Sequence, residues 1–259
     1  MKVVVLAGGF GTRISEESRF KPKPMVELGG MPILWHIMKM YSRCGFDEFV
    51  ICAGYRQSVI KEYFANYFLH TSDVTFDFTG GRQDVTVRHS ASEPWKVTVV
   101  DTGLETMTGG RVKRIAPYVG GETFMLTYGD GVADVDFRAE LEFHRSHGRM
   151  LTITAVNPGQ RFGALDIAPD GAVRSFREKA TGDAPLINGG FMVCEPSLFD
   201  LIEGDSTVLE KGPFERAAAA GQLMAWRHKG FWQCMDNVRE KEYLDSLWRA
   251  GKAPWKTWA

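Results

Sequence analysis

The residues that could do chemistry begin directly after the first apolar run. Residues 3–7 are apolar, and three glycines, a hydroxyl and a guanidinium follow within six positions, at Gly8, Gly9, Gly11, Thr12 and Arg13. Glycines let a backbone approach a bulky anion and point several N–H groups at it. An arginine can hold a phosphate with two parallel hydrogen bonds. This loop therefore predicts a site for a phosphate-bearing ligand.

A second cation follows ten residues later, where the backbone is restricted. Lys23 lies between Pro22 and Pro24, whose rings fix their own φ angles and limit the residues before them. Its ammonium is a compact point charge, which complements the fork of Arg13. A glycine-rich turn alone can be only a turn, but the loop and Lys23 together favour phosphate binding.

Two aspartates could supply a metal site. Asp130 lies between two glycines after an apolar run at 124–127, and Asp236 follows another short run at 231–235. Ligands of open α/β sheets bind at the carboxyl ends of strands, so these carboxylates could share one Mg²⁺ that bridges phosphate oxygens. Each also has a simpler interpretation: a turn residue, or, for Asp236, the cap of a helix that begins near residue 238.

Strands and helices alternate along most of the chain, and this order must position the loops. The pattern predicts an α/β fold, a mainly parallel mixed sheet flanked by helices on both faces. The expected elements are strands at 2–6, 49–53 and 124–127 and helices at 32–44, 57–68 and 136–147.

Two segments depart from this alternation. Residues 73–100 alternate apolar and polar residues in three short runs, which is typical of antiparallel strands or hairpins. Residues 151–194 are also rich in strand-forming residues, with a tight turn expected at 170–171. We expect one domain over residues 1–259 with β-rich insertions at these two places.

Composition limits the classes of partner. The chain has 259 residues and a net charge of −1, so no global field attracts nucleic acid or a membrane surface. No apolar run approaches the roughly 18 residues of a membrane span, and the N-terminal run is too short for a signal peptide. We expect a cytoplasmic protein without nucleic-acid or membrane partners. The cysteines lack metal-ligand spacing and are expected as reduced thiols: Cys44, Cys52, Cys194 and Cys234.

Residues 6–13, with Pro-Lys-Pro-Met at 22–25, closely resemble the signature of the sugar-phosphate nucleotidyltransferases. Further stretches resemble the cytidylyl-transferring branch of that family from end to end: residues 32–41, 60–68, 128–134 and 251–258. The resemblance implies a Rossmann-like fold of the nucleotide-diphospho-sugar transferase type. It also implies Mg²⁺-dependent transfer of a cytidylyl group from CTP to glucose 1-phosphate, which releases pyrophosphate.

The resemblance also implies the residues of the site. It implies Arg13, Lys23 and Asp130 as catalytic residues and Asp130 and Asp236 as metal ligands. The remaining implied contacts to the nucleotide are Leu6, Ala7, Gly8, Gly9, Gly11, Thr12 and Arg111, and Thr108 and Gly129 are implied as further substrate contacts. Those implied for the hexose phosphate are Gly163, Glu178, Lys179 and Asn188. Where the family has Glu-Lys-Pro, this chain has Ala180 in place of the proline, which questions the rigidity of that loop and not its chemistry.

Finally, the family implies a homo-oligomer, a hexamer, for which residues 73–100 offer a contact surface. It implies a product used to build dideoxysugars of surface polysaccharides such as the lipopolysaccharide O-antigen. Uridylyl or thymidylyl transfer remains an alternative, because sequence spacing does not reveal how a base is read, and so does a non-catalytic sugar-nucleotide binder. A dinucleotide-dependent oxidoreductase is disfavoured because no Gly-x-Gly-x-x-Gly is present, and a P-loop kinase because no Gly-Lys-Ser/Thr is present.

Overall fold

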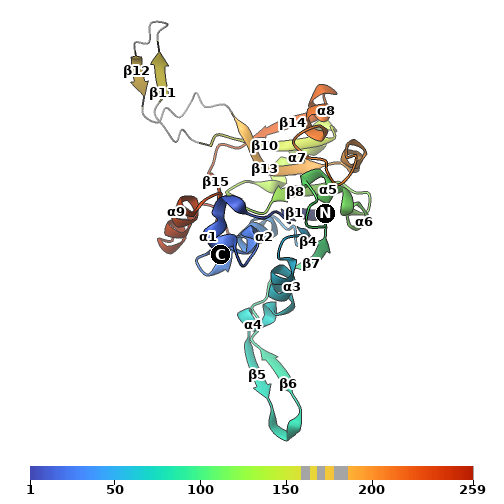
Figure 1. The fold of residues 1–259 in the computed structure, drawn as a ribbon, viewed down its shortest axis with the longest axis vertical. Helices are drawn as coiled ribbons and strands as arrows, with labels where there is room; N and C mark the ends of the chain where they lie inside the picture. The colour runs from blue at the N-terminus through green and yellow to red at the C-terminus, as the bar shows by residue number, and fades with distance from the viewer. Residues whose placement is uncertain (159–163, 168–172, 178–185, 259) are drawn as a thin grey trace.

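The protein is seen in a computed structural model that describes residues 1–158, 164–167, 173–177 and 186–258. For residues 164–167 and 173–177, and for residues 13, 15, 16 and 70, the structure describes the backbone and not the side chain. A seven-stranded sheet forms its centre, in the order β14-β10-β13-β8-β1-β4-β7 (Figure 1). These strands are β1 (Lys2–Ala7), β4 (Glu48–Ala53), β7 (Lys96–Asp101), β8 (Phe124–Tyr128), β10 (Leu151–Val156), β13 (Ile187–Cys194) and β14 (Leu223–Arg227).

The strand β1 lies between parallel neighbours, with β4 on one side and β8 on the other. Its residues from Val3 to Ala7 are all buried, because helices cover both faces of the sheet. The sheet is mixed, since β13 runs antiparallel to both β8 and β10. The predicted α/β architecture, with a mainly parallel mixed sheet, is confirmed.

Two apolar layers lie on the two faces of this sheet. Val3 and Val5 of β1 face a core that includes residues of α2, α7 and α9, whereas Val4 and Leu6 face residues of α5, α6 and α8. The helices are α1 (Ser15–Ser18), α2 (Ile33–Arg43), α3 (Gln57–Ala65), α4 (Tyr67–Thr71), α5 (Thr108–Arg114), α6 (Ala116–Val119), α7 (Phe137–His147), α8 (Pro213–Ala219) and α9 (Val238–Arg249). Four 3-10 turns are η1 (Thr12–Ile14), η2 (Lys23–Met25), η3 (Thr79–Gly81) and η4 (Pro196–Leu201).

One predicted helix is divided in the structure. Residues 57–68, expected as a single helix, form α3 and the start of α4, with Asn66 between them. The backbone of Asn66 leaves the helical region, with φ −106° and ψ 13°, and its amide donates to the Glu62 carbonyl. The apolar stripe that predicted one helix is therefore shared between two short ones.

The segment at 73–100 contains two kinds of strand. The hairpin of β5 (Asp73–Asp77) and β6 (Asp84–Arg88) is antiparallel, as expected, and extends away from the body of the protein (Figure 1). The expectation that residues 97–99 are also antiparallel is wrong, since they belong to β7, which pairs in parallel with β4 at the edge of the main sheet. Its partner lies far back in the chain, so alternation alone could not identify it.

Three further strand pairs are antiparallel. They are β2 (Glu27–Leu28) with β3 (Met31–Pro32), β9 (Gly131–Ala133) with β15 (Trp232–Cys234), and β11 (Ala164–Ile167) with β12 (Val173–Arg177). The pair β9–β15 joins the chain just after β8 to the chain just before α9, and this connection matters for the site. Among the described residues, no helix is long and apolar enough to cross a membrane.

Candidate active site

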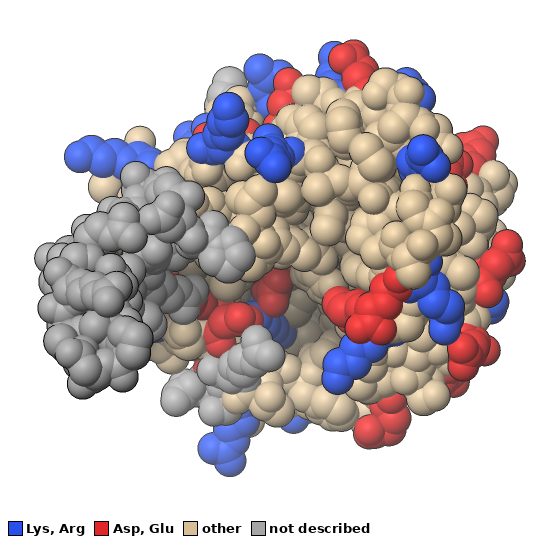
Figure 2. Space-filling view, turned by 90° about the horizontal axis from the view of Figure 1, so that it is seen from above, with Lys and Arg blue, Asp and Glu red and all other residues tan. Residues whose placement is uncertain are grey.

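A cavity of about 340 Å³ opens at the carboxyl ends of β1 and β8 and reaches the loop after β7. Seen from above, the molecule has a hollow in which carboxylates and cations lie beside one another (Figure 2). Most of the residues predicted for catalysis or substrate binding line the cavity: Leu6, Ala7, Gly8, Gly9, Gly11, Lys23, Thr108, Arg111, Gly129 and Asp130. The structure thus brings together segments that are more than 100 residues apart.

Two of the glycines in this wall are required by close packing. A Cβ on Gly8 would lie 2.1 Å from Nη1 of Arg111, and one on Gly129 would lie 2.8 Å from both the Leu6 carbonyl oxygen and Pro24 Cγ. The loop after β1 therefore packs directly against α5, and the loop after β8 packs against β1 and η2. This packing holds the backbone of both loops at the cavity surface.

Lys23 occupies the centre of the charged part of the site. Its ammonium lies 2.6 Å from Asp130 Oδ2 and 2.6 Å from Asp236 Oδ1. The η2 turn fixes its backbone, because Met25 N–H donates to the Pro22 carbonyl and Val26 N–H donates to the Lys23 carbonyl. The backbone of Lys23, which Pro22 and Pro24 were predicted to restrict, thus adopts a 3-10 turn.

Charge keeps this lysine protonated. Burial lowers the pKa of Lys23, but the charge of Asp130 and hydrogen bonds to Asp130 and Asp236 outweigh it, so the pKa rises above its ordinary value. Two carboxylates that converge on one cation offer the oxygen ligands that a hard divalent ion prefers. The ammonium lies within 2.6 Å of an oxygen of each, so the chemistry of Asp130 and Asp236 fits a shared divalent cation.

The β9–β15 ribbon brings these two aspartates together. Gly131, next to Asp130, pairs with Cys234, which is two residues before Asp236. Just beyond the ribbon, the Met235 N–H donates to the Asp130 carbonyl at 2.8 Å. The backbone of the two segments is therefore joined at the point where the carboxylates meet, a connection that no local sequence pattern indicates.

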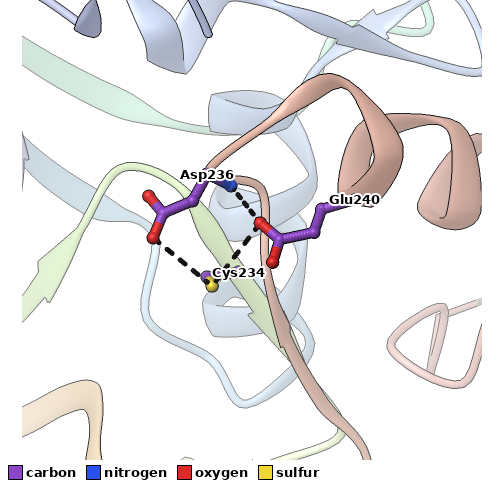
Figure 3. Close-up of side chains that lie close together, drawn as sticks. All are labelled: Cys234, Asp236 and Glu240. Carbon is purple, nitrogen blue, oxygen red and sulfur yellow. Dashed lines mark hydrogen bonds between the residues drawn. The ribbon is translucent and has the colours of Figure 1, made fainter. Parts of the chain in front are cut away.

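The residue that caps α9 is Asn237, not Asp236. The Asn237 side chain accepts from the Glu240 N–H at 3.0 Å, and the Asp236 carboxylate instead faces Lys23. Behind it, Asp236 N–H donates to Glu240 Oε2 at 2.6 Å, and Cys234 Sγ lies 3.8 Å from Asp236 Oδ2 (Figure 3). Burial, with the charges of Glu240, Asp236 and Asp130, raises the pKa of Cys234 to about 12. The Cys234 thiol is therefore neutral near pH 7.

Arg111 belongs to α5 and is buried, with only 5% of its surface exposed. Its Nη1 donates to Thr102 Oγ1 at 2.8 Å and to the Gly103 carbonyl at 2.7 Å, and its Nη2 donates to the Leu104 carbonyl at 3.1 Å. Among the described residues, no carboxylate forms an ion pair with it. Arg111 thus fixes the loop after β7 and presents a positive charge to the cavity.

A second cavity of about 210 Å³ lies beside the first. Asn188, predicted for the hexose phosphate, lines this second cavity together with Trp232, whose indole N–H donates to the Gly189 carbonyl at 2.7 Å. Tyr128 and Asp130 line both cavities. The two residues therefore lie between the two cavities.

Tyr128 is held by a residue that the sequence did not single out. Its hydroxyl donates to Glu210 Oε1, and the other oxygen of Glu210 accepts from Thr108 Oγ1 at 2.9 Å. Burial and the charge of Glu210 raise the pKa of Tyr128, so the phenol stays neutral. Glu210 therefore connects the wall between the cavities to the start of α5.

Several predicted residues are not placed in these cavities. Thr12 begins η1 and lines neither of them, and the side chain of Arg13 lies outside the described part of the structure. Gly163, Glu178 and Lys179 lie outside the described residues. Conversely, sequence reasoning missed Tyr128, Trp232 and Glu210. Tyr128 and Trp232 each adjoin a predicted aspartate segment, which was a usable signal, whereas nothing near Glu210 indicated its role.

Comparisons with known proteins identify the family of this chain. A sequence model of the nucleotidyl transferase family matches residues 2–225. The chain is 60% identical over 259 residues to the glucose-1-phosphate cytidylyltransferase of Salmonella typhimurium, and 39% identical over 259 residues to a probable glucose-1-phosphate cytidylyltransferase of Bacillus subtilis. Each match covers 100% of both chains.

Solved structures show the same fold at low identity. The crystal structure of HddC from Yersinia pseudotuberculosis has a TM-score of 0.69 at 22% identity and covers 95% of this chain and 99% of its own. A UDP-glucose pyrophosphorylase complexed with UDP-glucose has a TM-score of 0.67 at 14% identity, over 96% of this chain and 98% of its own. With the family model and full-length relatives in agreement, this chain belongs to the nucleotidyl transferase family.

Proposed function

We propose that this enzyme transfers the cytidylyl group of CTP to α-D-glucose 1-phosphate, giving CDP-glucose and pyrophosphate. A phosphate oxygen of glucose 1-phosphate attacks the α-phosphorus of CTP. The new P–O bond forms as the bond to the bridging oxygen of the β-phosphate breaks, and pyrophosphate leaves in line. The observation that carries the proposal is the meeting of Lys23, Asp130 and Asp236 where the two cavities adjoin.

The two cavities suit the two substrates. The larger one, with the Gly-rich loop on its wall, suits the nucleotide, whose phosphates would accept from backbone N–H groups. The smaller one, with Asn188 and Trp232, suits the hexose. Both substrates are anions, so holding them together against their repulsion is the main task of the site. Lys23 lines the larger cavity, and we expect it to bind the phosphate that is transferred.

Asp130 and Asp236 would hold Mg²⁺, which when bound neutralises phosphate oxygens and polarises the α-phosphorus. The chain's own contribution is to bring the two carboxylates to one point through the β9–β15 ribbon. Lys23 would then give up its contact with these carboxylates for a phosphate oxygen. The phosphate oxygen, like the two carboxylates, would favour the charged form of Lys23.

The reaction can be tested directly. Purified protein with CTP, glucose 1-phosphate and MgCl₂ should release pyrophosphate and form CDP-glucose, identified by its ³¹P NMR spectrum. Substrate binding without pyrophosphate release would favour the alternative of a non-catalytic sugar-nucleotide binder. Faster turnover of UTP or dTTP than of CTP would favour uridylyl or thymidylyl transfer.

We further propose that the enzyme is a homo-oligomer, with six copies as the family resemblance implies. The β5–β6 hairpin supports self-association, because Phe76 is opposite Val85, and both side chains are 46% exposed. Two substitutions, Phe76→Ser and Val85→Ser, should lower the mass measured by sedimentation velocity. An unchanged mass would mean that this hairpin makes no contact between copies.

The cellular setting follows from the same resemblance. We place the enzyme in the cytoplasm, which suits its free cysteines. The product would supply dideoxysugar synthesis for lipopolysaccharide O-antigens. Deleting the gene in its host should therefore remove the dideoxysugar from purified lipopolysaccharide, and an unchanged sugar composition would contradict this placement.

A further inference from the structure

A buried carboxylate of α9 binds the segment that carries Asp236. Asp236 N–H donates to Glu240 Oε2 at 2.6 Å, four residues along the chain (Figure 3). Glu240 is only 7% exposed, so its carboxylate has been taken out of water for this contact. A buried, charge-assisted hydrogen bond of this kind is short and directional. It therefore restricts the backbone of Asp236 more than an exposed contact would.

This contact goes beyond the capping of α9. In a capping box, the glutamate at the third helical position accepts from the N–H of the N-cap residue. Glu240 is the third residue of α9, but it accepts from Asp236, the residue before the N-cap Asn237. Asn237 completes the other half of the arrangement by accepting from Glu240 N–H. The helix start is thus used to fix the residue that faces the site.

We propose that Glu240 is a positioning residue of the metal site, holding Asp236 by its backbone N–H so that the carboxylate faces Asp130 and Lys23. The inference rests on the proposed function, in which Asp130 and Asp236 hold a divalent ion. Met235 N–H, bonded to the Asp130 carbonyl, fixes the segment on one side, and Glu240 fixes it on the other. Residues that orient metal ligands from behind typically contribute 10–100-fold to affinity.

Two substitutions of Glu240 separate the effect of side-chain length from the effect of charge. Glu240→Gln keeps the length of the side chain and an acceptor for Asp236 N–H but removes the charge. Glu240→Asp keeps the charge but is shorter by one methylene, about 1.5 Å, so it loses the contact. The readout is the affinity of nucleotide-free protein for Mn²⁺, measured from the EPR signal of the free ion. We expect Glu240→Asp to weaken binding by about tenfold or more, and Glu240→Gln to weaken it by clearly less.

The chain offers a matched control in α8. Glu215 is also a third helical residue, and it accepts from Gly212 N–H at 3.2 Å, away from the site. Glu215→Asp should leave the Mn²⁺ affinity unchanged. In the Glu240→Asp variant, excess Mg²⁺ should restore part of the lost kcat, which a purely structural defect would not allow.

A larger loss with Glu240→Gln than with Glu240→Asp would overturn the proposal, because Glu240 would then act by its charge or as a direct ligand. Equal losses for Glu215→Asp and Glu240→Asp would also overturn it, by showing general destabilisation. If wild-type protein bound Mn²⁺ and Glu240→Asp bound it equally well, only this inference would fail. If wild-type protein bound no Mn²⁺, the proposed metal site itself would fail, and this inference with it.

Discussion

Lys23 Nζ and Asp236 Oδ1 lie 2.6 Å apart, although 213 positions separate the two residues in the chain. The same ammonium lies 2.6 Å from Asp130 Oδ2. Both carboxylates that we propose as metal ligands therefore share one lysine ammonium, whose single positive charge offsets part of theirs. A divalent ion and the Lys23 ammonium would compete for the same oxygens.

This competition predicts an unusual effect of Lys23→Met. The substitution removes the ammonium, so nucleotide-free protein should bind Mn²⁺ about tenfold more tightly, a gain of about 1.4 kcal/mol. At the same time kcat/KM should fall by roughly a hundredfold or more, because a charge on the reacting phosphates is lost. Mn²⁺ titration followed by EPR, together with steady-state kinetics, measures both effects.

Lys21→Met is the control, since Lys21 pairs with the exposed Glu27 and not with the site aspartates. It should change neither quantity. Mn²⁺ affinity that stays the same or falls in Lys23→Met would contradict the competition, and near wild-type kinetics would mean that Lys23 is structural.

Divalent cations should be strictly required. Excess EDTA should abolish pyrophosphate release, and Asp130→Ala should lower turnover by a factor on the order of a hundred or more, comparable to the loss of a major electrostatic contact. Full activity in excess chelator would rule out the metal site that we propose for Asp130 and Asp236.

Glu140 is a buried carboxylate of α7, and its ionisation predicts how the stability of the protein depends on pH. Burial raises the pKa of Glu140 to about 7 from an ordinary 4.5, although a hydrogen bond from Thr154 opposes the rise. The neighbouring Tyr41 and Cys194 have raised pKa values and stay neutral. The folded protein therefore binds the Glu140 proton more tightly than the unfolded chain, so this group's contribution to stability falls as the pH rises from about 4.5 to about 7.

Glu140→Gln removes this titration and keeps an acceptor for Thr154. It should raise the free energy of unfolding at pH 8 by up to about 3 kcal/mol, with little gain near pH 5. Urea unfolding at the two pH values measures it. Glu142→Gln, on the exposed side of the same helix, should show no such difference. A gain of the same size at pH 5 and at pH 8 would count against the raised pKa.

The two substrate sites should respond separately to substitution. The family resemblance assigns Lys179 to the sugar phosphate and Arg13 to the triphosphate. Lys179→Ala should therefore raise KM for glucose 1-phosphate far more than KM for CTP, and Arg13→Ala should do the reverse. Both variants should melt within a few degrees of wild type, because we expect both side chains to contact substrate and not the core. Equal weakening of both substrates by both substitutions would mean that this division is wrong.

The sequence predicts features that a few adjacent residues carry, and it does not predict contacts between residues far apart in the chain. The Gly-rich loop and the Pro-flanked Lys23 were visible because a few adjacent residues carry their chemistry, and the structure places both at one cavity. The pairing of β7 with β4 was missed because parallel partners are far apart in the chain.

The site itself shows the same limit. The meeting of Asp130 and Asp236 depends on the β9–β15 ribbon, and the roles of Glu210 and Glu240 depend on contacts that exist only in the folded chain. Local residue types favoured Asp236 as a helix cap over a metal ligand. The resemblance to a family, rather than spacing, separated the two.

Base selection tests the central claim most directly. Pyrophosphate release should be measured with glucose 1-phosphate and Mg²⁺ against CTP, UTP, dTTP and ATP in turn, as kcat/KM for each nucleotide. The account predicts that CTP is the preferred substrate and that CDP-glucose is the product. No pyrophosphate release with CTP, or a higher kcat/KM for any of the other three nucleotides, would contradict it.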